Sequence, residues 1–244
     1  MKSIKDIISS SMTLAIAISV VSLGLSYGVA SAASSDTTNK LPTIVARATK
    51  EINQRLTTLS SLSAQVTNST KLNSADKTSL SVEISSETAG LTTLKTQIAT
   101  DTTADQASTD EATIYTDYRV YAVVVPKVEL LTITDNQQNN EAKLTTLAQS
   151  LQVKITDDQT DGKNSTSLAT AQTELNSMSA QITDAQQIST TIENDVSPVL
   201  PSNWNANHNI FSGNRTELTA AYHENQVASS DANNIDSILK SIKS

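Results

Sequence analysis

The sequence predicts an all-α, elongated fold built from long antiparallel helical hairpins that pack as a coiled-coil-like helical bundle. Helix breakers are scarce, since the 244 residues include only 5 Gly and 4 Pro, which leaves room for long helices. Apolar residues recur at alternating steps of three and four, as they do along one face of a helix. Aromatic residues make up only 3% of the chain, which argues against a thick globular core.

Residues 1–32 have the three parts of a secretory signal peptide. Lys2 and Lys5 form a positive start, an apolar run of about 18 residues follows, and Ala30 and Ala32 are the small residues that signal peptidase requires. The alternative is an uncleaved membrane anchor, because the run is nearly long enough to span a bilayer. We favour cleavage and expect an exported protein, secreted or at the cell surface, without membrane insertion afterwards.

The apolar pattern divides the rest of the chain into consecutive segments. We expect a polar spacer at 33–41, a first helical hairpin at 42–99, a Tyr-rich connecting helix at 100–126, a second hairpin at 127–196, a loop with Pro and Trp at 197–213 and a C-terminal helix at 214–244. Helices joined by a short loop must run antiparallel and side by side, which is why each pair is expected to form a hairpin.

The first hairpin has two regular apolar stripes. Its first helix repeats every seven residues at Val45, Ile52, Leu59 and Val66, and its second carries Leu80, Ile84, Leu91, Leu94 and Ile98. Asn73 or Ser74 can cap the second helix. Glu87 interrupts the second stripe, and Asn225 interrupts the stripe of the C-terminal helix in the same way. Each either faces water or pairs across helices and sets their register.

The connecting segment allows two interpretations. Tyr115, Tyr118 and Ala122 lie at helical spacing, whereas the valine run 123–125 also suits a strand. A lone strand leaves its backbone unpaired, so we favour a helix that is kinked or broken at Pro126.

The second hairpin is interrupted once and then becomes very regular. The polar run DNQQNNE at 135–141 is either an exposed turn of helix or a local break. Gly162 suits the turn between the two helices of this hairpin, because a glycine can take the left-handed backbone conformation just after a helix. Residues 168–196 keep strict three- and four-residue steps, which implies left-handed supercoiling against neighbouring helices.

A longer stretch resembles a known family. YTDYRVYAVVVPKVELL at 115–131, with LNSADKTSL at 72–80 and GKNSTSL at 162–168, is similar to a family of secreted all-helical bacterial proteins from candidate-phylum and actinobacterial lineages. The resemblance covers roughly 40–240, and it implies secretion, a helical fold and a Pro-bearing loop before the last helix. It implies no chemistry, because that family has no assigned activity. This chain departs from it in using Thr, Ser, Asn and Gln where relatives use Ala and Lys.

Neither a metal nor a catalytic site is expected. His208 and His223 are the only histidines and no cysteine occurs, so we expect two solvent-facing histidines rather than a zinc site. The turn after Asp157 lacks the calcium ligands needed at its third and twelfth positions, Gln159 and Leu168. No nucleophile, metalloprotease or phosphate-binding motif occurs, so we expect neither an enzyme nor a cofactor.

One candidate binding surface remains. It consists of Tyr115, Tyr118, Arg119, Tyr121 and Trp204, residue types that are enriched at protein interfaces. The alternative interpretation, which we favour, makes the tyrosines the thickest part of a thin core, at the joint between the hairpins.

The predicted function is structural or protein-binding. A formal net charge of −8 argues against nucleic acid and anionic membrane surfaces as partners. We expect a cell-envelope or extracellular protein as the partner, and the sequence leaves self-association open. The alternative is an amphipathic helical protein that binds lipid or another hydrophobic ligand, although such proteins need wider apolar faces than these narrow stripes.

Overall fold

The computed structural model describes residues 40–242 and confirms the all-α fold class, with no strand among those residues. The predicted signal peptide and nearly all of the predicted spacer lie outside the described residues. Between Lys40 and Ile242, no helix combines the length and the apolar character that crossing a membrane requires.

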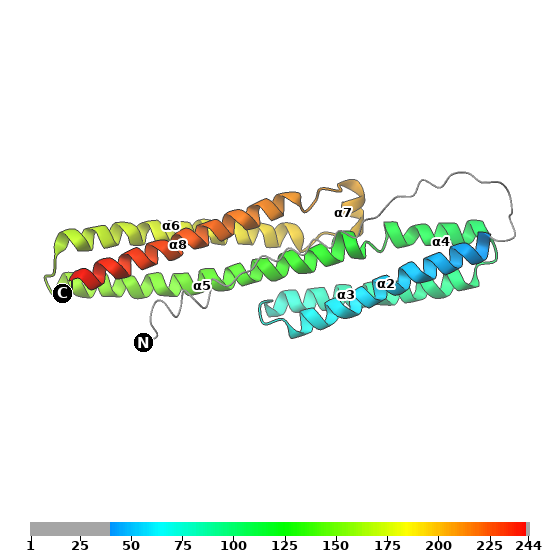
Figure 1. Ribbon diagram of the computed structural model, residues 1–244, viewed down its shortest axis with the longest axis horizontal. Helices are drawn as coiled ribbons and strands as arrows, with labels where there is room; N and C mark the ends of the chain where they lie inside the picture. The colour runs from blue at the N-terminus through cyan, green and yellow to red at the C-terminus, as the bar shows by residue number, and fades with distance from the viewer. Residues whose placement is uncertain (1–39, 243–244) are drawn as a thin grey trace.

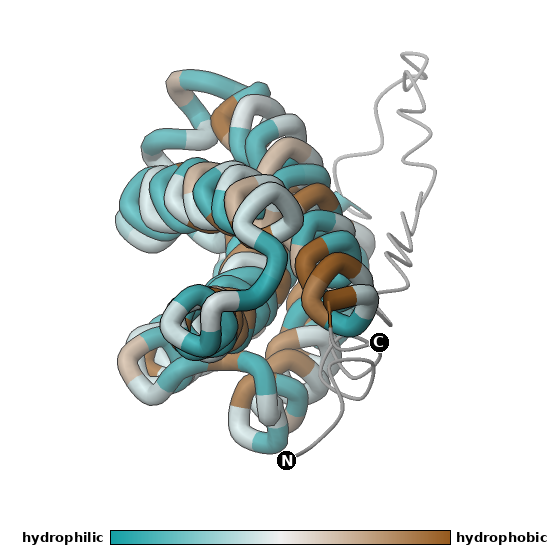
Figure 2. The backbone as a smooth tube through the Cα atoms, turned by 90° about the vertical axis from the view of Figure 1, so that its left-hand side faces the viewer, coloured by the Kyte–Doolittle hydropathy of each residue, from teal (hydrophilic) through white to brown (hydrophobic). Residues whose placement is uncertain are grey.

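The helices form two three-helix bundles that lie end to end in an elongated molecule (Figure 1). In chain order they are α2 (Lys40–Asn68), α3 (Ser74–Thr100), α4 (Ala104–Thr116), the π-helical turn η1 (Val120–Val124), α5 (Val125–Thr160), α6 (Ser165–Val196), α7 (Pro201–Ala206) and α8 (Ser212–Ile242). The first bundle contains α2, α3 and α4, and the second contains α5, α6 and α8. Seen along the molecule, each helix carries both hydrophilic and hydrophobic residues (Figure 2).

Both predicted hairpins are present, but each packs against a third helix. α4 lies along α2 and α3, and α8 lies along α6 and α5. The segment expected to connect the hairpins therefore belongs to the first bundle. The expected loop at 197–213 contains the short helix α7, which begins at Pro201, where a missing N–H costs nothing.

The break in the connecting segment lies earlier than predicted. α4 ends at Thr116, the chain turns at 117–119, and η1 then leads directly into α5. Pro126 lies in the first turn of α5, so it begins the long helix instead of breaking one. The valine run is helical, and the strand alternative is wrong.

The polar run at 135–141 is neither exposed nor a break, contrary to both interpretations of its sequence. α5 continues through it, and Asp135, Gln137 and Glu141 are buried. Their side chains find partners on α3, α6 and α8, which hydropathy alone does not reveal. These residues and their partners separate two apolar clusters, one at the joint and first bundle and one at the far end of the second bundle.

Candidate functional site

Two exposed tyrosines hold a buried arginine between them where the bundles meet. Arg55 of α2 is only 6% exposed, and its Cζ lies 5.1 Å from the ring centroids of both Tyr115 and Tyr121. The two tyrosines are 40% and 39% exposed. A guanidinium group between two aromatic faces is favoured by cation–π attraction, so the three side chains form one ordered unit, here called the Tyr–Arg–Tyr stack.

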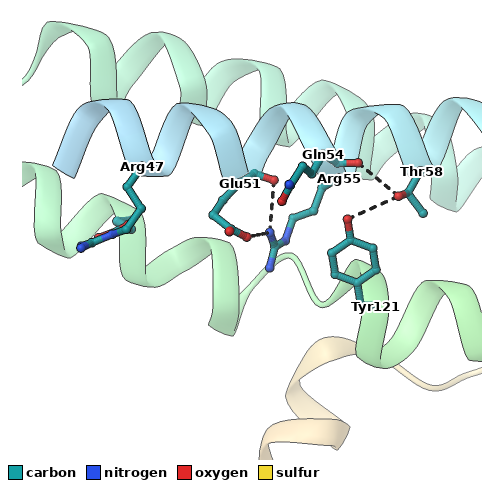
Figure 3. A network of polar contacts seen from close by, with 7 residues as sticks. Arg47, Glu51, Gln54, Arg55, Thr58 and Tyr121 are labelled. Carbon is teal, nitrogen blue, oxygen red and sulfur yellow. Dashed lines mark hydrogen bonds and ion pairs between the residues drawn. The ribbon is translucent and has the colours of Figure 1, made fainter. Parts of the chain in front are cut away.

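Polar contacts from α2 fix this stack (Figure 3). The Arg55 NH1 group donates to a Glu51 carboxylate oxygen at 2.7 Å and to the Glu51 carbonyl at 3.1 Å. The Thr58 hydroxyl donates to the Tyr121 hydroxyl at 3.4 Å. Burial is the main cause that raises the pKa of Tyr115. The charge of the Arg55 guanidinium is matched by the Glu51 carboxylate, and the stack presents two tyrosine rings as aromatic surface.

Tyr118 packs against α3, whereas Tyr115 and Tyr121 contact Arg55 of α2. Its ring packs so closely on α3 that a Cβ added at Gly90 would lie 2.5 Å from its Cε1 atom. The half-buried ring also packs against the first apolar cluster. The core interpretation therefore holds for Tyr118, whereas Tyr115 and Tyr121 lie at the surface.

Arg119 and Trp204 attach α7 to the break between α4 and η1. Arg119 Nε donates to Asn205 Oδ1 at 2.9 Å, and Asn205 Nδ2 donates to the Thr116 carbonyl at 2.9 Å. Trp204 packs partly buried against the first apolar cluster, with His208 5.6 Å away between ring centroids. Both predicted groups, the tyrosine stretch and the Trp loop, thus meet at the joint.

Arg55 and its partner Glu51 were not among the residues predicted from the sequence. The signal was present, because Arg55 occupies a position between Ile52 and Leu59 on the otherwise apolar stripe of α2. A charged residue on a buried face requires a partner, and here the partners come from α2 itself and from the tyrosines.

The two polar residues on apolar stripes behave differently. Asn225 pairs across helices, since its Nδ2 donates to Gln137 Oε1 at 3.0 Å. Glu87 has one buried carboxylate oxygen without a hydrogen-bond partner. Burial, followed by the charge of Glu83, raises the pKa of Glu87 to about 7, while Lys127 opposes the rise.

Residues 40–242 contain no group of three or more His, Cys, Asp or Glu side chains placed to hold a metal ion. The predicted exposure of both histidines is confirmed, because His208 and His223 face solvent.

The chain matches no protein-family model, no curated protein and no solved structure. The resemblance to a family of secreted helical proteins stays a prediction that depends mainly on residues 115–127.

Proposed function

We propose that this protein is an exported, non-enzymatic helical protein that binds a cell-envelope or extracellular protein at the joint between its bundles. The observation that supports it is the Tyr–Arg–Tyr stack, in which two exposed tyrosines are held in place by the buried Arg55. Tyrosine and arginine are enriched at the centres of interfaces. Rings that are already ordered lose little conformational entropy on binding, which favours affinity.

The alternative, a binder of lipid or another hydrophobic ligand, has weaker support. A groove of about 290 Å³ lies between α5 and α6. Its lining is mostly amide and hydroxyl side chains, namely Thr145, Gln149, Gln152, Asn176, Ser179, Thr183 and Gln186. A lipid-binding groove requires a predominantly apolar lining, so this groove does not favour the alternative.

A photo-crosslinking experiment tests the proposal. p-Benzoylphenylalanine replaces Tyr121 in the mature chain, and in a control chain it replaces the exposed Thr173 of α6. The probe at 121 is expected to capture one defined envelope protein that the probe at 173 does not. Excess unlabelled protein should compete for that partner, and the Tyr115→Ala variant should compete poorly. Equal capture from both positions, or equal competition by the variant, would remove the stack as a binding site.

A further inference from the structure

Buried acidic groups meet where the tip of the α2–α3 hairpin contacts the second bundle. Asp76 of α3 and Asp135 of α5 are 5% and 2% exposed. Asn73 links them, because its backbone N–H and its side-chain amide donate to Asp135 at 2.7 and 2.8 Å, and the amide also reaches Asp76 at 3.4 Å. Glu193 of α6 faces the same pair and accepts a hydrogen bond from Gln138 at 2.8 Å.

A second acidic group lies further along the same seam between α3 and α5. Lys127 is 2% exposed, and its Nζ donates to both carboxylate oxygens of Glu83 at 2.9 and 2.8 Å. Glu87, one turn beyond Glu83, contributes the unpartnered buried oxygen described above and faces Tyr118. The seam, here called the α3–α5 seam, thus holds several carboxyl groups and one buried lysine.

We propose that the α3–α5 seam is a pH-controlled clasp, which holds the first bundle against α5 when Asp76 and Glu87 are protonated while Glu83 stays paired with Lys127, and which releases the bundle as Asp76 and Glu87 lose their protons at higher pH. The seam joins the two bundles through non-covalent contacts, whereas the chain from α4 through η1 provides the covalent connection.

The electrostatics determine the direction of the effect. Two neighbouring buried carboxyl groups cannot both ionise without strong repulsion. Burial, followed by the charges of Asp135 and Glu193, raises the pKa of Asp76 from 3.8 to about 6. The charged groups that face Glu87 are Glu83 and Lys127, and its pKa is raised to about 7.

The closed seam therefore binds protons more tightly than the open one. Well below their ordinary pKa values Asp76 and Glu87 hold their protons in both states, and their contribution to closure is then largest. The preference for closure decreases as the pH rises from about 4 to about 7, that is, from the ordinary pKa values through the raised ones. A shift of about two pKa units corresponds to roughly a 100-fold change in the closing equilibrium.

The absence of cysteine from the whole chain makes a direct test simple. Spin labels are attached to Ser86→Cys on α3 and Thr191→Cys on α6, both exposed, and their separation is measured by double electron–electron resonance from pH 4.5 to pH 8. One short, narrow distance is expected at pH 4.5. A longer population should grow as the pH rises towards about 7, and it should stop growing above that pH.

Matched variants distinguish the seam from general acid effects. Asp76→Asn with Glu87→Gln keeps the side-chain shapes without the charges, and it is expected to stay closed at every pH. Glu141→Gln removes a buried carboxyl group of the second bundle, outside the seam, and should open as the wild type does. A constant distance in the wild type overturns the proposal, as does opening that persists in the double variant. Loss of the helical circular dichroism signal in parallel with the distance change would indicate unfolding and would overturn it as well.

Discussion

Among single residues, Gly90 is the position whose substitution is most informative. Gly to Ala within a helix usually stabilises it by about 1 kcal/mol. Here the added Cβ would lie 2.5 Å from Tyr118 Cε1 and 2.6 Å from its hydroxyl oxygen, so the ring must move out of its packed position. We expect Gly90→Ala to destabilise the protein by about 1–3 kcal/mol, measured by urea denaturation.

The control is the same substitution in a Tyr118→Ala background. Without the ring, Gly90→Ala should recover the usual stabilisation, so the double-mutant cycle reports the contact directly. A gain of stability in both backgrounds would show that Tyr118 does not pack on Gly90.

Arg55 provides a second test at this scale. Arg55→Lys keeps the charge and the contact with Glu51 but loses the planar group between the two rings, and we expect it to lower the free energy of unfolding by about 1–2 kcal/mol. Arg47→Lys is the matched control, because Arg47 is largely exposed and pairs with Glu111, so a loss of only about 0.5 kcal/mol is expected. Equal losses for the two variants would contradict the cation–π role.

The pattern of residues along a single helix could predict only part of the tyrosine site at the joint. The sequence indicates that Tyr115, Tyr118 and Tyr121 are unusual, but it assigns the first two to one face. Because the helix is broken at 117–119, Tyr121 joins Tyr115 at Arg55 of α2, whereas Tyr118 packs on Gly90 of α3. Arg55 lies 60 or more residues earlier along the chain, and no local pattern links positions so far apart.

At the scale of helices, two asparagine caps allow a matched comparison. Asn164 caps α6 through two backbone N–H groups at 3.1 Å, and Asn164→Ala should cost about 1 kcal/mol. Asn73 caps α3 and also donates twice to Asp135. Because Asn73→Ala removes both the cap and a hydrogen bond to a buried carboxyl group, we expect a cost of about 2–4 kcal/mol in chemical denaturation. Similar costs would show that Asn73 acts only as a cap.

The polar layer of the second bundle predicts a pH-dependent effect of Glu141→Gln. Burial raises the pKa of Glu141, while hydrogen bonds from Ser189 at 2.8 Å and from Asn225 at 3.4 Å oppose the rise. The folded state therefore binds this proton more tightly than the unfolded state. The stability that Glu141 contributes is lost as the pH rises above the ordinary pKa of a glutamate side chain, which is near 4.

Glutamine keeps the acceptor oxygen without the charge. We expect the wild type and Glu141→Gln to differ little in unfolding free energy near pH 4. The variant should become the more stable protein by pH 8, as followed by urea denaturation across that range. A difference that does not change with pH would contradict the raised pKa.

Helices and hairpins were predictable because their periodicity is local. Alternating steps of three and four fix which face is buried, and most apolar residues on those faces are buried. The burial of polar side chains in 135–141 was not predictable from the sequence. Polar side chains are buried only when they find hydrogen-bond partners, and here those partners lie on other helices. The position of the break was also missed, since a proline is compatible with both the end and the first turn of a helix.

For the whole molecule, the arrangement of the bundles predicts an elongated particle. α5 alone has 36 residues and is therefore about 54 Å long, and the first bundle extends beyond its start. Small-angle X-ray scattering of the mature chain should give an asymmetric distance distribution with a long tail. A symmetric distribution typical of a compact globule would contradict the end-to-end placement of the two bundles.

The opposite placement of Lys40 and Ile242 has a mechanical consequence. The first residue of α2 and the last of α8 lie at the two far ends of the molecule (Figure 1). A pulling force applied between them must pass through the break at 117–119, because the chain crosses from one bundle to the other only there. The helices at either side are loaded nearly along their axes, so extension is expected to begin at the joint while both bundles stay folded. The protein therefore consists of two rigid helical bundles connected by one flexible joint. The stiffness of this joint depends on the contacts around Arg55, Asp76 and Lys127.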